Sequence, residues 1–280
     1  MVMRLPLPNI NSLDLIEVVV AERQSGPNAG YFTGIQNAWK ARITEFIQSQ
    51  GNPEVVRPWV TVAVDRQKYL TLFEKPARES AQGNMLSQLR SRELQLCPAC
   101  GEDGTPNTLD HYLPKGSYPE FAIAPPNLTP MCDICQGEKL DRTLDGDDQR
   151  LFLQPYFDQF LGTQVLVLII EPPYHAPAPA RIEPNPGLPV PQFALVQRHL
   201  EALDIPRRFN RFFRDQYVRL LKLTRAIREK DQNVRESLQT FETMAASKSV
   251  NSWLHVFYAG VLANEELLQF LEYGDLPEDI

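Results

Sequence analysis

Apolar and polar positions follow a helical period over three stretches in the first third of the chain. Residues 11–23 and 34–51 each set an apolar stripe against charged positions, and the second stretch ends at a glycine suited to close a helix. We predict helices in both, although the run of four apolar residues in the first leaves a strand as its alternative. Residues 77–96 predict a further helix that leads to the first cysteine pair.

The pattern changes in the middle of the chain. Residues 97–150 are rich in Gly, Pro and Asp, which predicts loops and short strands, and 160–170 has the β-branched character of a buried strand. Eight prolines between Glu171 and Pro191 exclude a helix and a central strand and favour an extended surface excursion. We expect 192–197 to be the returning strand of a β-hairpin.

A helical pattern resumes at Ile205 and continues to the end of the chain. Breaks are expected near Asp231, Ser247 and Gly260. The chain of 280 residues is long enough to bury a sizeable core. The sequence therefore predicts a mainly α protein, α+β overall.

Composition narrows the class of protein. The N-terminus lacks the features of a secretion signal, and the longest apolar run, residues 165–170, is too short to span a bilayer. We expect a soluble, cytoplasmic protein with no membrane contact. A net charge of −7 argues against a general nucleic-acid coat protein.

The four cysteines lie in two Cys-x-x-Cys pairs, with 31 residues between the pairs. In a chain without an export signal, this spacing favours thiolates on a metal over disulfides. Four thiolates fill the tetrahedral shell of Zn²⁺, so we predict a structural zinc site, with Gly101 at a tight knuckle and a short helix starting at the second pair. A redox dithiol and ordinary buried thiols are the alternatives. The predicted ligands are Cys97, Cys100, Cys132 and Cys135.

A polar series is interleaved with the cysteine pairs: Asp110-His111 in LDHYLPK, Asn127 in PPNL, and Gln136 and Lys139 in CQGEK. In order, spacing and residue type, about 45 residues resemble the HNH endonuclease family, which carries the ββα-metal fold. The phrases YPEF and QPYFD are similar to a subgroup of bacterial HNH proteins often encoded beside an ATPase subunit in phage-defence operons.

The chemistry of phosphodiester hydrolysis gives each residue a role. His111 is the expected general base, and Asp110 is a hard oxygen ligand for a catalytic Mg²⁺ or Mn²⁺. On a regular strand these two neighbours would point to opposite faces, so we expect the strand to be irregular. By resemblance, Asn127 fastens the hairpin loop and thereby orients the histidine.

The series departs from the family at one position. Gln136 stands where the family usually has His or Asn as the second metal ligand, and its longer side chain implies weaker or water-mediated metal binding. Lys139, one helical turn further on, is expected either to meet a phosphate or to be a solvated lysine. His175, His199 and His255 are not part of such a motif, and we interpret them as histidines without a catalytic role.

The middle of the chain is acidic, so a nucleic acid is expected to bind elsewhere. Residues 97–150 carry four basic and ten acidic side chains, whereas 204–230 carry nine basic and three acidic ones. On a helix, seven of the basic residues share an arc of roughly 140° opposite an apolar face, which predicts contact with DNA or with an acidic partner, or simply a solvated face. These residues are Arg207, Arg208, Arg211, Arg214, Arg219, Lys222 and Arg225.

These observations lead to one preferred function and one alternative. The resemblance implies a metal-dependent HNH endonuclease that hydrolyses DNA, acting with an ATPase partner subunit in anti-phage defence; RNA is an alternative substrate. The competing hypothesis is an inactive zinc-knuckle scaffold of a nucleic-acid complex. The expected regions are an N-terminal helical region (1–96), an HNH module with zinc knuckles (97–159), and a β-hairpin with a Pro-rich loop followed by helices (160–280).

Overall fold

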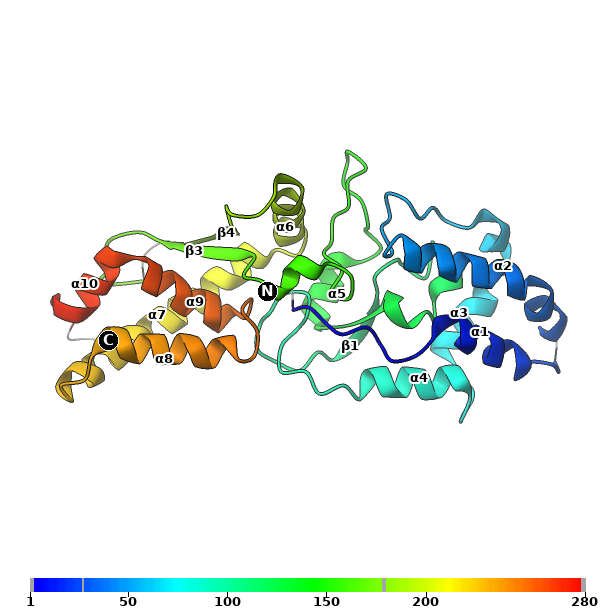
Figure 1. The fold of residues 1–280 in the computed structure, drawn as a ribbon, viewed down its shortest axis with the longest axis horizontal. Coiled ribbons are helices and arrows are strands. Elements are labelled where there is room, and N and C mark those ends of the chain that lie inside the picture. The colour runs from blue at the N-terminus through cyan, green and yellow to red at the C-terminus, as the bar shows by residue number, and fades with distance from the viewer. Residues whose placement is uncertain (1–2, 27, 178–179, 278–280) are drawn as a thin grey trace. The chain divides into compact units, whose positions relative to one another are not determined.

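The computed structural model describes residues 3–26, 28–177 and 180–277. The chain forms two compact units, each built from non-contiguous segments and named here after its β-hairpin (Figure 1). The β1–β2 unit comprises Arg4–Leu94 and Thr105–Asp158; the β3–β4 unit comprises Met1–Met3, Gln95–Gly104 and Gln159–Ile280.

The β1–β2 unit begins with helices that surround a small hairpin. Its chain order is α1 (Ser12–Ala21), α2 (Ala29–Gln48), a 3₁₀ turn (Val60–Asp65), α3 (Arg66–Glu74), α4 (Ala81–Arg90), β1 (Thr108–His111), 3₁₀ turns at Pro119–Phe121 and Pro125–Asn127, β2 (Leu128–Met131) and α5 (Asp133–Lys139).

Strands β1 and β2 pair antiparallel, and α5 follows β2 after a single residue. Asp110 lies opposite Thr129, and His111 lies opposite Leu128. Cys132 caps the start of the helix, and its sulfur accepts a hydrogen bond from the Cys135 N–H at 3.4 Å. The unit therefore contains a β-hairpin followed directly by a short helix, in the order β1–β2–α5.

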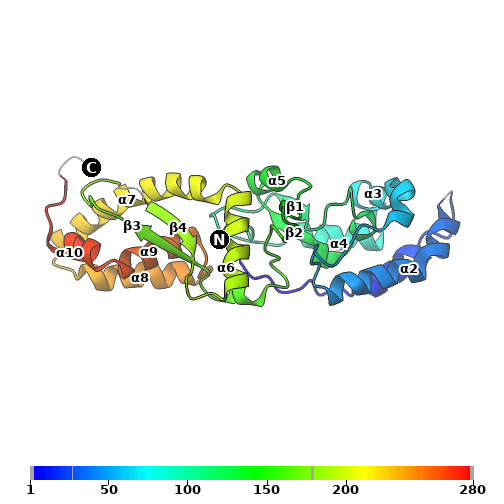
Figure 2. The same cartoon turned by 90° about the horizontal axis from the view of Figure 1, so that it is seen from above.

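The β3–β4 unit packs its hairpin against helices. Strand β3 lies beside α9, and β4 lies beside α6 and α7 (Figure 1 and Figure 2). The elements are a 3₁₀ turn (Gln159–Gly162), β3 (Leu166–Ile170), β4 (Ala180–Pro184), α6 (Val190–Ala202), α7 (Ile205–Glu229), α8 (Val234–Ala246), α9 (Trp253–Ala263) and α10 (Glu265–Tyr273).

The mainly α, α+β fold class is confirmed, and so are helices over most of 11–23 and 34–51. The helix predicted over 77–96 is shorter, because α4 ends at Arg90. Helix α3 lies within the predicted N-terminal helical region (1–96), but it was not singled out as a separate helix.

The prediction of a returning strand at 192–197 is wrong, because these residues lie inside α6. The partner of β3 is instead β4, where Ala180, Ile182 and Pro184 are buried on alternate positions between the prolines. Proline in the first turn of α6 costs that helix no hydrogen bond, which explains how a Pro-rich segment leads into a helix.

The break predicted at Gly260 is also wrong, because α9 continues to Ala263. A Cβ atom on Gly260 would lie 2.7 Å from the Leu168 Cβ and 3.0 Å from the Leu168 carbonyl oxygen. Glycine at this position therefore allows α9 to approach β3 closely and does not end the helix.

None of the helices in the described part of the chain has the length and apolarity needed to cross a bilayer.

We predict that Gly260→Ala destabilises the protein. The added methyl group must displace the Leu168 backbone, and such overpacking costs about 1–3 kcal/mol, more than the gain of up to ~1 kcal/mol in helix propensity. Gly34→Ala in α2 is the matched control, because a Cβ there meets nothing within 4 Å. Urea unfolding should show a loss for Gly260→Ala and no loss for Gly34→Ala; equal behaviour would contradict the proposed packing.

Candidate functional site

The four cysteines form a cluster that could hold a metal ion such as zinc. The sulfur atoms of Cys97, Cys100, Cys132 and Cys135 all lie within 4.8 Å of one another. Among the described residues this is the one group of at least three Cys, His, Asp or Glu side chains with such geometry. Four sulfur ligands at one point are typical of a closed, structural zinc site.

The first cysteine pair, Cys97 and Cys100, lies on a tight turn in the β3–β4 unit. The Gly101 N–H donates to the Cys97 carbonyl at 2.7 Å, and Gly101 has a φ of +71°, a conformation that favours glycine. The Cys97 N–H donates to the Glu102 carbonyl at 3.1 Å, which closes the turn. The knuckle expected at Gly101 is therefore present.

Side chains from two helices bind the carbonyl oxygens of this turn. The Trp253 indole N–H donates to the Cys100 carbonyl at 2.6 Å, and the Trp253 backbone N–H donates to the Gly101 carbonyl at 3.1 Å. The buried His199 donates from Nε2 to the Ala99 carbonyl at 2.7 Å. His199, for which the sequence indicates no partner, thus supports the turn that carries Cys97 and Cys100.

Arg208 contributes a charge beside the cysteines. Its Nη2 atom lies 3.5 Å from the Cys100 sulfur, and the same nitrogen pairs with the Glu102 carboxylate. The guanidinium also lies over the Trp253 ring at 5.6 Å. A cation that hydrogen-bonds a thiolate offsets part of the negative charge of a four-thiolate site.

Asp110 and Lys139 form a buried ion pair across β1 and α5. The Lys139 ammonium lies 3.0 Å from Asp110 Oδ2 and donates to the His111 carbonyl at 2.8 Å. Lys139 is only 1% exposed, so it is not the solvated helix-end lysine considered from the sequence. Burial raises the pKa of the Asp110 carboxyl, while the Lys139 charge and a hydrogen bond from Gln136 oppose that rise.

Among the described residues, the His111 ring makes one polar contact. Its Nε2 atom lies 2.9 Å from the Ala122 carbonyl oxygen; because a carbonyl can only accept, Nε2 must carry the proton. The ring also packs edge-on against Phe73, with 4.4 Å between centroids. Burial lowers the pKa of His111 to about 3, so the imidazole is neutral at pH 7.

Asn127 fastens the loop between β1 and β2. Its side-chain oxygen accepts from the Leu113 N–H at 2.7 Å, and its amide nitrogen donates to the carbonyls of Leu113 at 3.0 Å and Phe121 at 3.2 Å. The side chain is fully buried, and no water is needed to complete these bonds. Asn127 thus ties both Leu113 and Phe121 to the end of the loop, and the Ala122 carbonyl follows the Phe121 carbonyl that Asn127 binds.

Helix α2 anchors the same loop from the other side. The Trp39 indole N–H donates to the Glu120 carbonyl at 2.7 Å, and Arg42 pairs with the Glu120 carboxylate at 2.8 Å. Burial raises the pKa of Glu120, and the Arg42 guanidinium opposes that rise. The QPYFD segment also packs here, since the Gln154 amide donates to the Pro126 carbonyl at 3.0 Å.

Two cations lie against Phe73, the ring that packs on His111. Arg90 and Lys115 each lie 5.5 Å from the centre of the Phe73 ring that packs on His111. Lys115 pairs with Glu74 at 3.2 Å, whereas Arg90 is exposed and has no acidic partner among the described residues. Arg90 therefore supplies, beside Phe73, a positive charge that the charge count of residues 97–150 does not include.

The structure brings part of the predicted series together. Asp110, Gln136 and Lys139 meet at the contact of β1 with α5. The pairing of β1 is regular at Asp110 and His111, contrary to the irregular strand that was expected. In the described part of the chain the His111 ring makes no hydrogen bond or ion pair with Asp110 or Gln136.

The basic face predicted on 204–230 is present on α7, but two of its seven arginine and lysine side chains bind other parts of the protein. Arg208 faces the cysteine turn, and Arg225 donates to the Pro277 carbonyl, so neither is presented freely to solvent. The other five lie on the exposed side of the helix: Arg207, Arg211, Arg214, Arg219 and Lys222.

The sequence did not single out Phe73, Arg90, Trp39 or His199 as parts of a site. Each reaches its partner from a helix far away in the chain, so no local spacing points to the contact. His199 lies on the buried stripe of an amphipathic helix. That position is equally typical of a core residue, so it does not indicate a role at the cysteine turn.

The chain is similar over part of its length to a phage protein. It is 36% identical over 65 residues to "Protein ea31" of Escherichia phage lambda, which is 23% of this chain and 22% of that protein. The match therefore spans about a fifth of the relative's length and carries no activity over to this chain. No family model and no solved structure matches the chain.

We predict that Arg208→Met loosens a zinc ion bound to the cysteine cluster. Removing the charge beside Cys100 leaves more negative charge on the thiolates, and loss of such supporting contacts lowers metal affinity by about 10-fold or more. Competition with a chromogenic chelator measures the change. Arg207→Met is the matched control, because Arg207 pairs with Asp204 and contacts none of the cysteines. Equal zinc retention by the two variants would rule out this role for Arg208.

Proposed function

We propose that this chain is a metal-dependent endonuclease of the HNH type that hydrolyses phosphodiester bonds in DNA. The observation that carries the proposal is the element order β1–β2–α5, with Asp110 and His111 on the first strand, Asn127 in the hairpin loop and Lys139 on the helix. The series that resembles the HNH family thus lies on a hairpin followed by a helix, which is the arrangement the resemblance implies.

His111 is the proposed general base. Its Nε2 proton is committed to the Ala122 carbonyl, so the lone pair that can take a proton from water is on Nδ1. Nδ1 has no hydrogen-bond partner among the described residues. Because burial lowers the pKa of the ring to about 3, the imidazole is neutral at pH 7 and Nδ1 keeps its lone pair.

The oxygen donors beside α5 fit a hard divalent ion. Asp110 Oδ2 is buried beside the Lys139 ammonium at 3.0 Å, and the Gln136 amide is adjacent. Mg²⁺ or Mn²⁺ is commonly held by one or two protein oxygens, with water in its other positions. When bound, such an ion lowers the pKa of a coordinated water and stabilises the charge that develops on the phosphate. Lys139 favours the ionised form of Asp110.

Arg90 and Lys115 are the proposed phosphate-binding groups of this site. Both cations lie against Phe73, which packs on the His111 ring, so they can place a phosphodiester next to the base. Asn127 is a positioning residue in this proposal, because it fastens the loop that carries the Ala122 carbonyl. The cysteine cluster is the proposed structural Zn²⁺ site.

The proposed setting follows from the resemblance alone. HNH proteins of the similar subgroup are encoded beside ATPase subunits in phage-defence operons, and we propose an ATPase partner for this chain. The ATPase would then control when and where the DNA is cut.

A zinc-bearing binding module without catalytic activity is the second candidate. The observation that favours it is the Lys139 ammonium at 3.0 Å from Asp110, which places a protein cation against the carboxylate assigned to the divalent ion. In that case Asp110, Lys139 and Asn127 would serve only to stabilise the hairpin.

Plasmid cleavage tests the nuclease proposal. We expect the protein, alone or co-purified with the product of a neighbouring ATPase gene, to nick or linearise plasmid DNA in Mg²⁺ or Mn²⁺. His111→Ala should lower the rate by at least ~100-fold, because removal of a general base costs about 10²–10⁴-fold. His175→Ala is the matched control, because His175 is exposed and lies outside the site.

The zinc content and thermal unfolding of both variants show whether the fold survives. Cleavage that is absent in every preparation, or equal in His111→Ala and the wild type, would contradict the nuclease proposal. If zinc binding and folding were intact in such preparations, the result would favour the binding module.

A further inference from the structure

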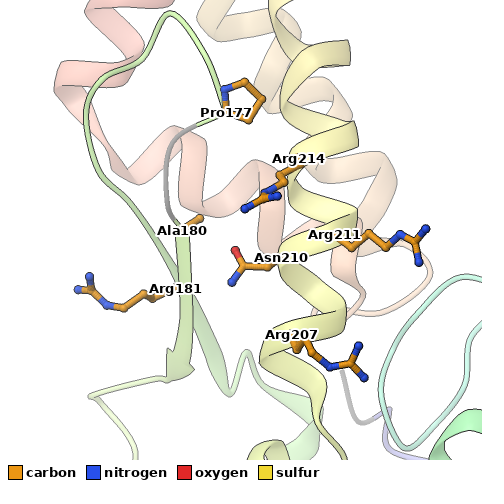
Figure 3. Close-up of a pocket in the computed structure, with 7 residues that line it drawn as sticks. All are labelled: Pro177, Ala180, Arg181, Arg207, Asn210, Arg211 and Arg214. Carbon is orange, nitrogen blue, oxygen red and sulfur yellow. The ribbon is translucent and has the colours of Figure 1, made fainter.

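An arginine-lined groove lies between α7 and β4 in the β3–β4 unit, with a volume of about 820 Å³ (Figure 3). Four of its seven lining residues are arginines, and none is acidic. Figure 3 shows the side chains of Asn210 and Arg214 projecting from α7 toward the strand. The lining residues are Pro177, Ala180, Arg181, Arg207, Asn210, Arg211 and Arg214.

The four arginines of the groove differ in whether an acidic side chain neutralises their charge. Arg181 pairs with Glu171 at 2.6 Å and with Glu183 at 3.1 Å, and Arg207 pairs with Asp204. Arg211 and Arg214 are exposed and have no ion-pair partner among the described residues. Figure 3 shows Arg214 projecting toward the strand and Arg211 projecting to the other side of α7, so the uncompensated charge within the groove comes from Arg214, and Arg211 extends it onto the exposed face of the helix.

This charge continues along the helix. Arg219 and Lys222 are also exposed and have no ion-pair partner in the described part of the chain, while Asp215 adds an acid on the same stretch. At 1.5 Å per residue, Arg211 and Lys222 are about 16 Å apart along α7. Like charges three or four residues apart destabilise a helix slightly, and a bound polyanion would remove that repulsion.

We propose that this groove and the exposed basic face of α7 bind the phosphate backbone of DNA. The apolar lining consists of Pro177 and Ala180 alone, without the aromatic or large aliphatic side chains that anchor protein interfaces. The guanidinium groups match the geometry of phosphate oxygens, and an amide donor accompanies them at Asn210. Such contacts position a nucleic acid without reading its sequence.

The proposal rests on the proposed nuclease function for the identity of its ligand, and it answers a difficulty of that function. Residues 97–150 carry a net charge of −6, from four basic and ten acidic side chains, and would repel DNA beyond the immediate surroundings of His111. The basic face of α7 supplies the attraction that this stretch lacks.

Fluorescence anisotropy with labelled duplex DNA, performed without Mg²⁺ or Mn²⁺ on the full chain carrying His111→Ala, separates binding from cleavage. Arg211→Ala/Arg214→Ala should weaken binding by about 10-fold and reduce the dependence of log Kd on log salt by about 2, one for each lost phosphate contact. Arg214→Ala alone should give an intermediate value. Lys230→Ala is the matched control, because Lys230 is an exposed lysine at the end of the same helix, outside the groove.

Several outcomes would overturn the proposal. These are a double variant that binds DNA like Lys230→Ala at every salt concentration, a parent chain that does not bind DNA, and tighter binding of RNA than of DNA at equal salt. Loss of an acidic partner protein from the double variant, with DNA binding unchanged, would assign the groove to that protein instead. If plasmid cleavage fails while the expected anisotropy changes are seen, the nuclease proposal fails and the DNA groove stands.

Discussion

The contact between the His111 ring and the Ala122 carbonyl is the constraint on which the β1–β2–α5 site depends. A buried carbonyl needs a donor, and a buried imidazole can supply one only from a nitrogen that carries a proton. The contact therefore fixes the tautomer of His111 as well as the direction of its ring. The carbonyl stays in place because the loop that carries it is fastened by Asn127 within and by Trp39 from α2.

The cysteine turn follows the same physical rule. The carbonyls of Ala99, Cys100 and Gly101 each accept from a side chain or backbone of α6 or α9, so the turn that carries Cys97 and Cys100 is rigid within its unit. Arg208 adds the charge that a thiolate cluster requires. In both parts of the molecule, long-range hydrogen bonds to backbone carbonyls hold short irregular segments where the regular elements end.

The sequence predicted those features that depend on local spacing. The amphipathic periods gave most helices, and the paired cysteines gave the cysteine cluster. The errors came from residues whose meaning depends on a distant partner. A glycine at position 260 suggests the end of a helix, and only the close contact with Leu168 shows that it serves packing instead. The strand at Ala180–Pro184 could not be recognised from its own residues, because it is defined by its pairing with β3. The surroundings of His111 were unpredictable for the same reason, since Phe73 and Arg90 arrive from α3 and α4.

The state of the His111 ring tests the account most directly. Long-range ¹⁵N–¹H correlation spectra, assigned by the loss of signals in His111→Asn, report which ring nitrogen carries the proton and the pH at which the second one is added. The account predicts a neutral ring with the proton on Nε2, which persists from pH 7 down to at least ~pH 5 because burial disfavours the charged form. A proton on Nδ1, or titration near the ordinary histidine value of about 6.5, would contradict it.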